Sequence, residues 1–232
     1  MNRRKMATQT PRAVTGNGFP RASKKEVLQK FRRESLLEAT RQVIAADGFD
    51  AVTMERVAEL AGITKGAIYL YFHNKHEMIL ETLEKTIAEM LQQIYERVDP
   101  GAKPWERLRQ IVTAQLQTLE QHKDMLRTSL LFRWLLENPR ERKKWRRLLR
   151  NRGVQQRRIK AILEDGIAQR VFPPMDTDTA AFCINEMALG TAHRRMMGFS
   201  DASLESDTAR LIAFLSLLCS APARNRSAPG PD

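Results

Sequence analysis

The residues with the clearest chemical potential lie in one short stretch, ITKGAIYLYFHNK, at residues 63–75. Thr64 and Lys65 stand next to a glycine, and Tyr69 and Tyr71 follow closely. Neither a glycine nor a cluster of aromatic residues favours a helix for its own stability. A hydroxyl and an ammonium group at a helix start can bind an anion, because the first amides of a helix are unpaired and carry the positive end of its dipole. The stretch therefore indicates contact with a polyanion outside the fold.

The residues before this stretch complete a motif that reads DNA. Thr53 is expected to cap a short helix that stops at Gly62, and Thr64 a second helix that reaches about Phe72. Two short helices joined by a tight turn have the proportions of a helix-turn-helix, whose second helix enters the major groove and meets base edges with its first residues. The sequence therefore predicts a helix-turn-helix at about residues 53–72.

Side chains in this motif are expected to play different roles. Gly66 and Ala67 carry little or no side chain, so the backbone can approach a groove closely. Lys65 can reach a guanine edge or a phosphate. Tyr69 and Tyr71 end in hydroxyls that can fix the positions of phosphates.

The inward face of the same helix is expected to pack against the protein. Ile68 and Phe72 are four residues apart and share a face with Ile63. The alternative interpretation is a fully packed core helix with its tyrosines at the rim, but one short helix cannot bury all of its faces. Lys75, just past this helix, is expected to bind backbone phosphate.

Residues 51–79, AVTMERVAELAGITKGAIYLYFHNKHEMI, resemble the helix-turn-helix signature of the TetR family of bacterial transcription regulators. The sequence resemblance covers about residues 27–80, and beyond them only the helical layout agrees. The matching elements are Thr53, Val57, Ala58, Ala61-Gly62, Thr64-Lys65-Gly66, Ile68-Tyr69, Tyr71-Phe72 and Lys75.

The resemblance implies a homodimer that places two recognition helices in successive major grooves of a palindromic operator in double-stranded DNA. It also implies a C-terminal domain that binds an unknown small-molecule effector. Leu70 stands where members often carry a polar or aromatic residue, so it either contacts a thymine methyl or packs. The positions implied to face DNA are Thr53, Thr64, Lys65, Ala67, Tyr69, Leu70, Tyr71 and Lys75.

Composition agrees with a cytoplasmic DNA-binding protein. The chain has 232 residues and a net charge of +12, which favours a polyanionic partner. Cys183 and Cys219 are far apart in apolar stretches, which argues against a disulfide scaffold and favours buried, inert thiols. The sequence lacks a run of 18 uncharged apolar residues and an apolar secretory signal, so no membrane span is expected.

The rest of the chain predicts an all-α fold in four parts. These are a flexible basic arm at 1–22, a DNA-binding domain at 23–80, a helical ligand-binding and dimerisation domain at 81–220, and a disordered tail at 221–232. Ser23 and Glu26 form a capping box for a first helix that ends at Gly48. Later helices are expected at about 78–98, 103–121, 124–137, 140–171, 177–197 and 204–220.

A second basic zone, residues 139–160, has two interpretations. Its charges fall between apolar positions of one helix, as on a solvated face, but they could also serve a second nucleic-acid contact. Arg152 and either Gln155 or Gln156 continue the apolar stripe, and all three are candidates for the wall of an effector pocket. Because a buried guanidinium needs an anion or several acceptors, Arg152 forms an internal salt bridge, lines an effector pocket, or lies in solvent. The arm at 1–22 either follows a minor groove or is a solvated tail.

The effector pocket and the dimer interface are assigned from apolar residues at helical spacing. Methionines and aromatic residues at helical spacing are more often plain core, whereas burial within one subunit is the weaker alternative for the two C-terminal helices. The two C-terminal helices suit a four-helix bundle across a two-fold axis, as the family uses. Pocket candidates besides the three polar residues are Met90, Ile94, Met125, Phe132 and Trp134, and interface candidates are Ile184, Met187, Ala188, Thr191, Leu211, Leu215 and Leu218.

Nothing in the sequence forms a catalytic or metal-binding set. His73 and His76 are three residues apart, but no further ligand follows at a fitting spacing. Phosphate-binding loops, nucleophile elbows and dinucleotide fingerprints do not occur, so no enzyme activity, metal or cofactor is expected. The sequence predicts a ligand-responsive, sequence-specific repressor. The alternatives are an activator, an architectural DNA-binding protein that uses both basic zones, or a helical enzyme.

Overall fold

A computed structural model describes the backbone of residues 23–131 and 139–220, and the side chains of residues 23–128 and 153–219. Within these ranges the chain is helical without strands, which confirms the predicted all-α fold. The proposed arm at 1–22 and tail at 221–232 lie outside the described residues. The elements are α1 (Lys24–Asp47), η1 (Phe49–Ala51), α2 (Met54–Leu60), α3 (Lys65–Ile68), α4 (Lys75–Glu96), α5 (Pro104–Gln121), α6 (Lys123–Leu131), α7 (Pro139–Ala168), α8 (Thr177–Met196) and α9 (Leu204–Ser220).

The N-terminal helices begin where polar side chains cap free amides. The Ser23 hydroxyl accepts from the Glu26 amide at 3.2 Å while the Glu26 carboxylate accepts from the Ser23 amide at 2.7 Å, so the predicted capping box is present. Thr53, Thr64 and Asn74 each accept from the amide three residues later through a side-chain oxygen, and so cap α2, α3 and α4. Each such cap stabilises its helix by about 1 kcal/mol. The local sequence thus fixes where these helices start.

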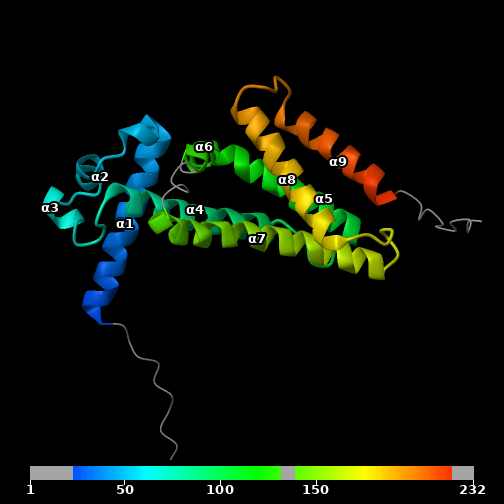
Figure 1. Cartoon of the computed structure of the whole chain (residues 1–232), viewed down its shortest axis with the longest axis horizontal. Coiled ribbons are helices and arrows are strands. Elements are labelled where there is room, and N and C mark those ends of the chain that lie inside the picture. Colours follow the sequence, from blue (N-terminus) through cyan, green and yellow to red (C-terminus); the bar gives the residue numbers. More distant parts are fainter. Residues whose placement is uncertain (1–22, 132–138, 221–232) are drawn as a thin grey trace, which may run out of the picture.

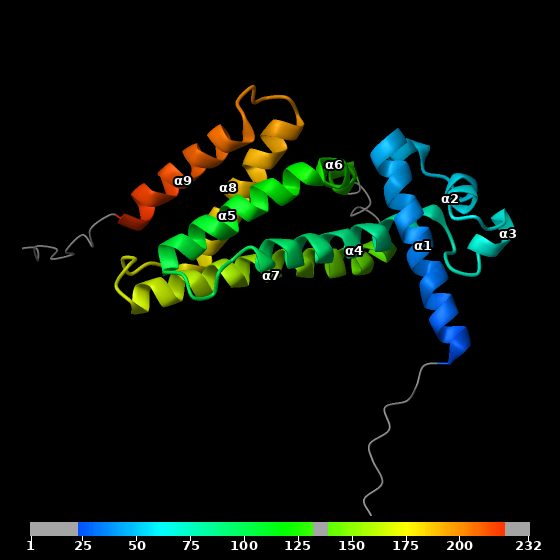
Figure 2. The same ribbon diagram turned by 180° about the vertical axis from the view of Figure 1, so that it is seen from behind.

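Two groups of helices share α4. Figures 1 and 2 show α1, α2 and α3 at one end, α5, α8 and α9 at the other, and α4 alongside α7 between them. The core of the first group contains Phe72 and Met78, whereas the core of the second contains Met90 and Ile159. Since Met78 and Met90 both belong to α4, this one helix is packed into both cores.

The third helix is shorter than the sequence predicts. α3 ends at Ile68 rather than near Phe72, and Leu70 and Tyr71 donate their amides to carbonyls only three residues back. The Tyr71 carbonyl accepts from the guanidinium of Arg33. Poor helix propensity of consecutive aromatic residues agrees with the early end of α3.

The C-terminal end of α7 depends on a glycine. Phe172, which is 4% exposed, folds back over Gly166, where an added Cβ would lie 2.1 Å from a ring carbon. Val171 and Phe172 donate their amides to the Gly166 carbonyl at 2.8 and 3.1 Å. Arg170 adopts the left-handed conformation, with φ of 58°, to make this turn. These contacts explain why α7 ends at Ala168 and not near residue 171.

Replacing Gly166 with alanine should destabilise the protein, because the new methyl group overlaps the Phe172 ring and forces it out of its packed position. We expect the free energy of unfolding, measured by urea denaturation, to fall by about 1–3 kcal/mol. Arg170→Gly at the same helix end is the matched control, and should raise stability by about 1 kcal/mol by removing left-handed strain. Unchanged stability of Gly166→Ala would contradict the packing.

Candidate nucleic-acid interface

The turn between α2 and α3 is held by backbone geometry. Gly62 adopts φ of 67°, a conformation that side chains with a Cβ disfavour. Its amide donates to the Glu59 carbonyl at 3.1 Å, and the Ile63 amide donates to the Ala58 carbonyl at 3.0 Å, which closes the end of α2. The tight turn that the sequence predicts at this glycine is therefore present.

The inward face of the recognition segment (residues 64–75) packs as expected. Ile68 and Phe72 are 0% and 1% exposed, and Ile63 packs against the same core. This confirms that Ile68 and Phe72 anchor the segment. Tyr69 is 47% exposed, as a tyrosine at the rim of a packed core helix would also be, but Leu70 at 83% exposure argues against that alternative.

The outward face presents mainly the predicted DNA-facing residues. Thr53, Thr64, Lys65 and Gly66 are exposed together with Tyr69 and Leu70, whereas Ala67, Tyr71 and Lys75 are half-buried. At 83% exposure Leu70 does not pack against the described part of the chain, which argues against the packing interpretation. Contact with a thymine methyl stays a prediction.

Gly66 is not required by the fold itself. Its backbone is helical with no left-handed φ, and an added Cβ would meet no atom within 4 Å. Glycine inside a helix costs roughly 0.5–1 kcal/mol relative to alanine. The absence of a side chain at this position therefore has no internal explanation, which agrees with close approach of an outside surface.

Polar groups around α3 are positioned by contacts within the motif. The Lys65 ammonium lies 2.5 Å from the Glu55 carboxylate, which joins α3 to α2 and lowers the pKa of Glu55. Thr53 and Thr64 accept from the amides of Arg56 and Ala67 through their side-chain oxygens. Each hydroxyl still carries its own proton, which can be donated to a phosphate oxygen.

Lys75 is engaged within the protein. Its ammonium donates to the Val52 carbonyl at 3.3 Å and lies 5.7 Å from the centre of the Phe49 ring. The side chain therefore connects the start of α4 to the segment before α2. The prediction that Lys75 reaches a phosphate would require this contact to be exchanged for one with DNA.

Arg33 of α1 is a positioning residue that the sequence analysis did not identify. Its guanidinium bonds both oxygens of the Glu81 carboxylate on α4 and the carbonyl of Tyr71, and it lies 4.3 Å from the centre of the Phe72 ring. One side chain thus joins α1, α4 and the end of the recognition segment. The partners are 38 and 48 residues away in sequence, so no local pattern marks this role.

The proposed effector residues do not converge on one described pocket. Met125 belongs to the first core and Met90 and Ile94 to the second, so they do not share a site. Gln155 is buried and Gln156 donates to the Asp178 carbonyl at 3.5 Å. The side chains of Phe132, Trp134 and Arg152 lie outside the described residues.

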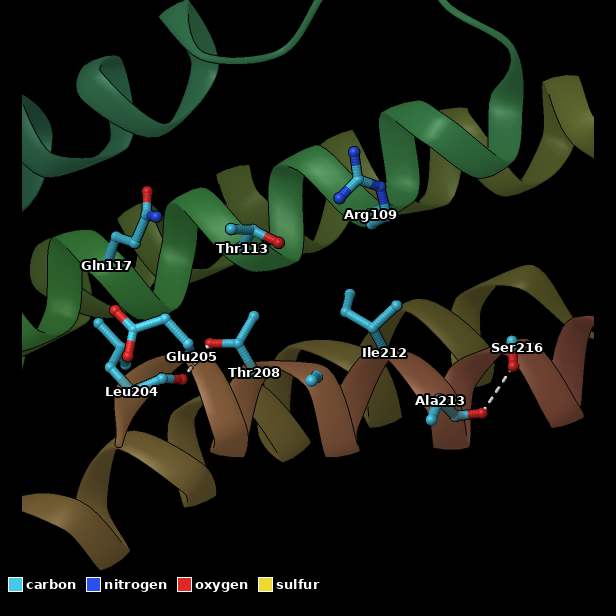
Figure 3. A pocket seen from close by; sticks show the side chains of 10 residues that line it. Arg109, Thr113, Gln117, Leu204, Glu205, Thr208, Ile212, Ala213 and Ser216 are labelled. Carbon is cyan, nitrogen blue, oxygen red and sulfur yellow. Dashed lines mark hydrogen bonds between the residues drawn. The ribbon is translucent and has the colours of Figure 1, made fainter. Parts of the chain in front are cut away.

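A groove of about 470 Å³ instead lies between α5 and α9. Figure 3 shows Arg109, Thr113 and Gln117 of α5 facing residues of α9 across it. None of the proposed effector residues lines this groove, which is completed by Leu204, Glu205, Thr208, Ala209, Ile212, Ala213 and Ser216.

Most of the proposed interface residues face the chain's own core. Ile184, Ala188, Leu211 and Leu215 are at most 8% exposed, so they are not available to a second copy, and these four assignments are wrong. Periodicity identified apolar helices correctly but could not tell which face turns inward. Leu218 is 51% exposed, whereas Met187 and Thr191 are half-buried.

The two cysteines differ in environment. Cys183 on α8 is exposed, so the expectation that it is buried is wrong, while Cys219 is buried and burial raises the pKa of its thiol. Across the described ranges, no three His, Cys, Asp or Glu side chains gather as metal ligands would. Of the helices whose residues are described, none is long and apolar enough to cross a bilayer.

Two family models match the chain. Residues 36–82 match the model described as bacterial regulatory proteins, tetR family, and residues 101–193 match the tetracyclin repressor-like C-terminal domain. Together they cover more than half of the chain. Both family descriptions concern regulators rather than enzymes, as the sequence analysis expected.

Curated relatives include transcriptional regulators. The uncharacterized regulator YhgD of Bacillus subtilis is 28% identical over 161 residues, which span 65% of this chain and 77% of that protein. The repressor KstR2 of Mycobacterium tuberculosis is 34% identical over 91 residues, which span 39% of this chain and 46% of that protein. The alignment thus covers less than half the length of KstR2.

Solved structures share the fold. A TetR regulator from Haloarcula marismortui aligns with a TM-score of 0.68 at 18% identity, over 82% of this chain and 97% of that one. FadR of Bacillus subtilis, solved in complex with stearoyl-CoA, aligns with a TM-score of 0.64 at 22% identity, over 81% of this chain and 97% of that one. At these identities the likeness concerns the fold alone.

Replacing Gly66 with leucine should separate folding from recognition. Leucine favours a helix and would meet no atom of the chain within 4 Å of its Cβ, so we expect unfolding stability to be kept or raised. Affinity for an operator fragment, measured by fluorescence anisotropy, should fall at least about tenfold, because the leucine side chain fills the space between the segment and the major groove of DNA. Glu34→Leu, on the exposed part of α1, is the control; unimpaired binding by Gly66→Leu would rule out close approach at this position.

Proposed function

The chain belongs to the TetR family of bacterial transcription regulators, and from this premise we propose that it is a homodimeric repressor that leaves a palindromic operator when a small-molecule effector binds. The observation that carries the DNA-binding part is the recognition segment. It is anchored through buried Ile68 and Phe72 while it exposes Lys65, Gly66 and Tyr69 on one outward surface. Such a surface suits a major groove, with Leu70 able to meet a thymine methyl.

The response to an effector is proposed to travel through α4. This helix is packed into both cores, and Glu81 at its N-terminal half holds Arg33 against the recognition segment. A tilt of α4 would therefore carry the segment with it. In a dimer, a change in the spacing of two such segments would misalign them with successive major grooves.

For the dimer interface we propose the outer faces of α8 and α9. Phe182 is 53% exposed on α8, and Gly190, two turns later, has open space where a Cβ would lie. Phe214, Leu217 and Leu218 form an exposed apolar stripe on α9. An apolar stripe beside a helical glycine allows the helices of a second copy to approach closely, as in a four-helix bundle.

The second basic zone supports a regulator better than an architectural protein. Arg158 donates to the Leu91 carbonyl at 2.7 Å and stacks 4.4 Å from the centre of the Tyr95 ring, so it joins α7 to α4. Lys160 lies 2.6 Å from the Asp178 carboxylate. These two cations are engaged within the fold, which leaves them poorly suited to non-specific DNA contacts, whereas Arg157 of the same described part is exposed.

Selection of bound fragments from a genomic library tests the proposed function. We expect recovery of a palindromic site whose binding persists in excess random DNA and weakens steeply with salt. Lys65→Ala and Tyr69→Ala should each lower affinity about tenfold with unchanged dimerisation and helicity, since each removes one DNA contact. Binding that random DNA abolishes would favour the architectural alternative, and loss of transcription on operator occupancy distinguishes a repressor from an activator.

Leu217→Arg should dissociate the proposed dimer. Leu217 is 71% exposed in the single chain, so the arginine leaves the subunit fold intact but places charges within the apolar stripe. We expect light scattering coupled to size exclusion to show a monomer, and operator affinity to fall about a hundredfold or more. Val171→Arg, at an exposed apolar residue on the end of α7, should remain dimeric; a dimeric Leu217→Arg would show that the interface lies elsewhere.

A further inference from the structure

A line of hydrogen-bonded side chains crosses the second core. The Gln155 amide nitrogen on α7 donates to the Gln115 oxygen on α5 at 3.2 Å. The Gln115 nitrogen donates to the Asn185 oxygen on α8 at 3.1 Å, and the Asn185 nitrogen donates to the Glu186 carboxylate at 3.4 Å. The three amides are only 3–5% exposed, whereas Glu186 lies on the exposed face of α8. We call these four residues the amide chain.

The carboxylate at one end sets the direction of the amide chain. The Asn185 nitrogen donates to the carboxylate of Glu186, so the Asn185 oxygen faces inward, and Gln115 and Gln155 are oriented in the same sense. The chain therefore ends on the oxygen of Gln155. That oxygen is buried and has no hydrogen-bond partner among the described residues. Leaving a buried acceptor unpaired costs about 1–3 kcal/mol, so this end of the chain calls for a donor.

A second polar group in the same core is also unpaired. Thr118 is 0% exposed, and its hydroxyl oxygen has no hydrogen-bond partner in the described part of the chain. It lies three residues after Gln115 on α5 and so shares a face with it. The surrounding core is aliphatic, with Ile111 and Ile159 at most 1% exposed. Both unpaired polar atoms lie in the same apolar core, so a molecule that reached them would have to be mostly apolar and carry a small polar group.

We propose that the amide chain recognises a hydrogen-bond donor, a hydroxyl or a neutral N–H, on the otherwise apolar effector. This inference rests on the proposed function, since it assigns the class of ligand that the regulator senses. The Gln155 oxygen repels a carboxylate or phosphate, so an anionic group is not bound at this point. An unsubstituted hydrocarbon chain would leave the oxygen unpaired and is rejected for that reason.

The other end of the amide chain reaches the proposed dimer interface. Glu186 is four residues from both Phe182 and Gly190, so the three lie on the same face of α8. The donor of a bound effector fixes the Gln155 oxygen, and through the amides it fixes the orientation of Asn185 beside Glu186. The hydrogen bond between the effector and Gln155 is in this way connected, through the amide chain, to the outer face of α8.

The test compares octan-1-ol with 1-methoxyheptane, which have the same number of heavy atoms but differ in the hydroxyl donor. Binding to the full chain is measured without DNA by calorimetry and thermal shift. We expect the alcohol to bind about tenfold more tightly, the value of one buried hydrogen bond. Glu186→Lys replaces the acceptor by a donor and should reverse the amide chain, so that Gln155 presents its nitrogen and the ether binds at least as well as the alcohol. Glu34→Lys makes the same charge change on α1 and should keep the preference.

Equal affinities for the two probes, or no binding of either, would overturn the proposal, as would an unaltered preference in Glu186→Lys. A crystal structure with octan-1-ol present that shows only a water on the Gln155 oxygen would also overturn it. Because these measurements contain no DNA, their failure leaves the regulator assignment standing. Loss of specific DNA binding with the probe preference intact would instead refute the proposed function alone.

Discussion

The guanidinium of Arg33 is the contact on which the orientation of the DNA-reading end depends. It donates to both carboxylate oxygens of Glu81 on α4 and to the carbonyl of Tyr71, and it stacks over the Phe72 ring. An arginine suits this position because its planar fork satisfies a carboxylate in two bonds and still offers further donors. The recognition segment is therefore not only packed on its own helices. It is also tied to the helix that leads into the rest of the molecule.

In the proposed mechanism, this tie makes α4 the element through which the two groups of helices communicate. A helix of 22 residues is about 33 Å long, so a small tilt at one end moves the other end appreciably. Its C-terminal half is fixed by Arg158, whose bond to the Leu91 carbonyl and stacking on Tyr95 join it to α7. Since α7 also carries Gln155, a ligand at the end of the amide chain would act on the helix that holds α4. For such a signal to pass, α4 and α7 would need two alternative packing arrangements, and the core would have to be well packed in both.

The sequence predicted features that depend on neighbours along the chain. Ser23, Thr53 and Thr64 begin helices because each side chain meets an amide three residues later, and this chemistry is visible in the residue types. Burial of Ile68 and Phe72 followed from spacing in the same way. Features that depend on distant partners were not predictable. The bond from Arg33 to the carbonyl of Tyr71, just after α3, comes from a residue 38 positions away, and the burial of Leu211 and Leu215 results from packing against other helices.

Gln155 shows where the two kinds of information meet. Helical phase placed it correctly on the buried stripe of α7, and its polarity suggested a pocket wall. Its meaning depends on Gln115 and Asn185, which come from α5 and α8 and are 40 and 30 residues away in sequence. A buried amide whose donors and acceptors are all paired only stabilises the fold. A chain of amides that ends on an unpaired oxygen also leaves an acceptor that can select a hydrogen-bond donor. The direction comes from the acceptor at Glu186, so a single exposed carboxylate determines which chemistry the core can accept.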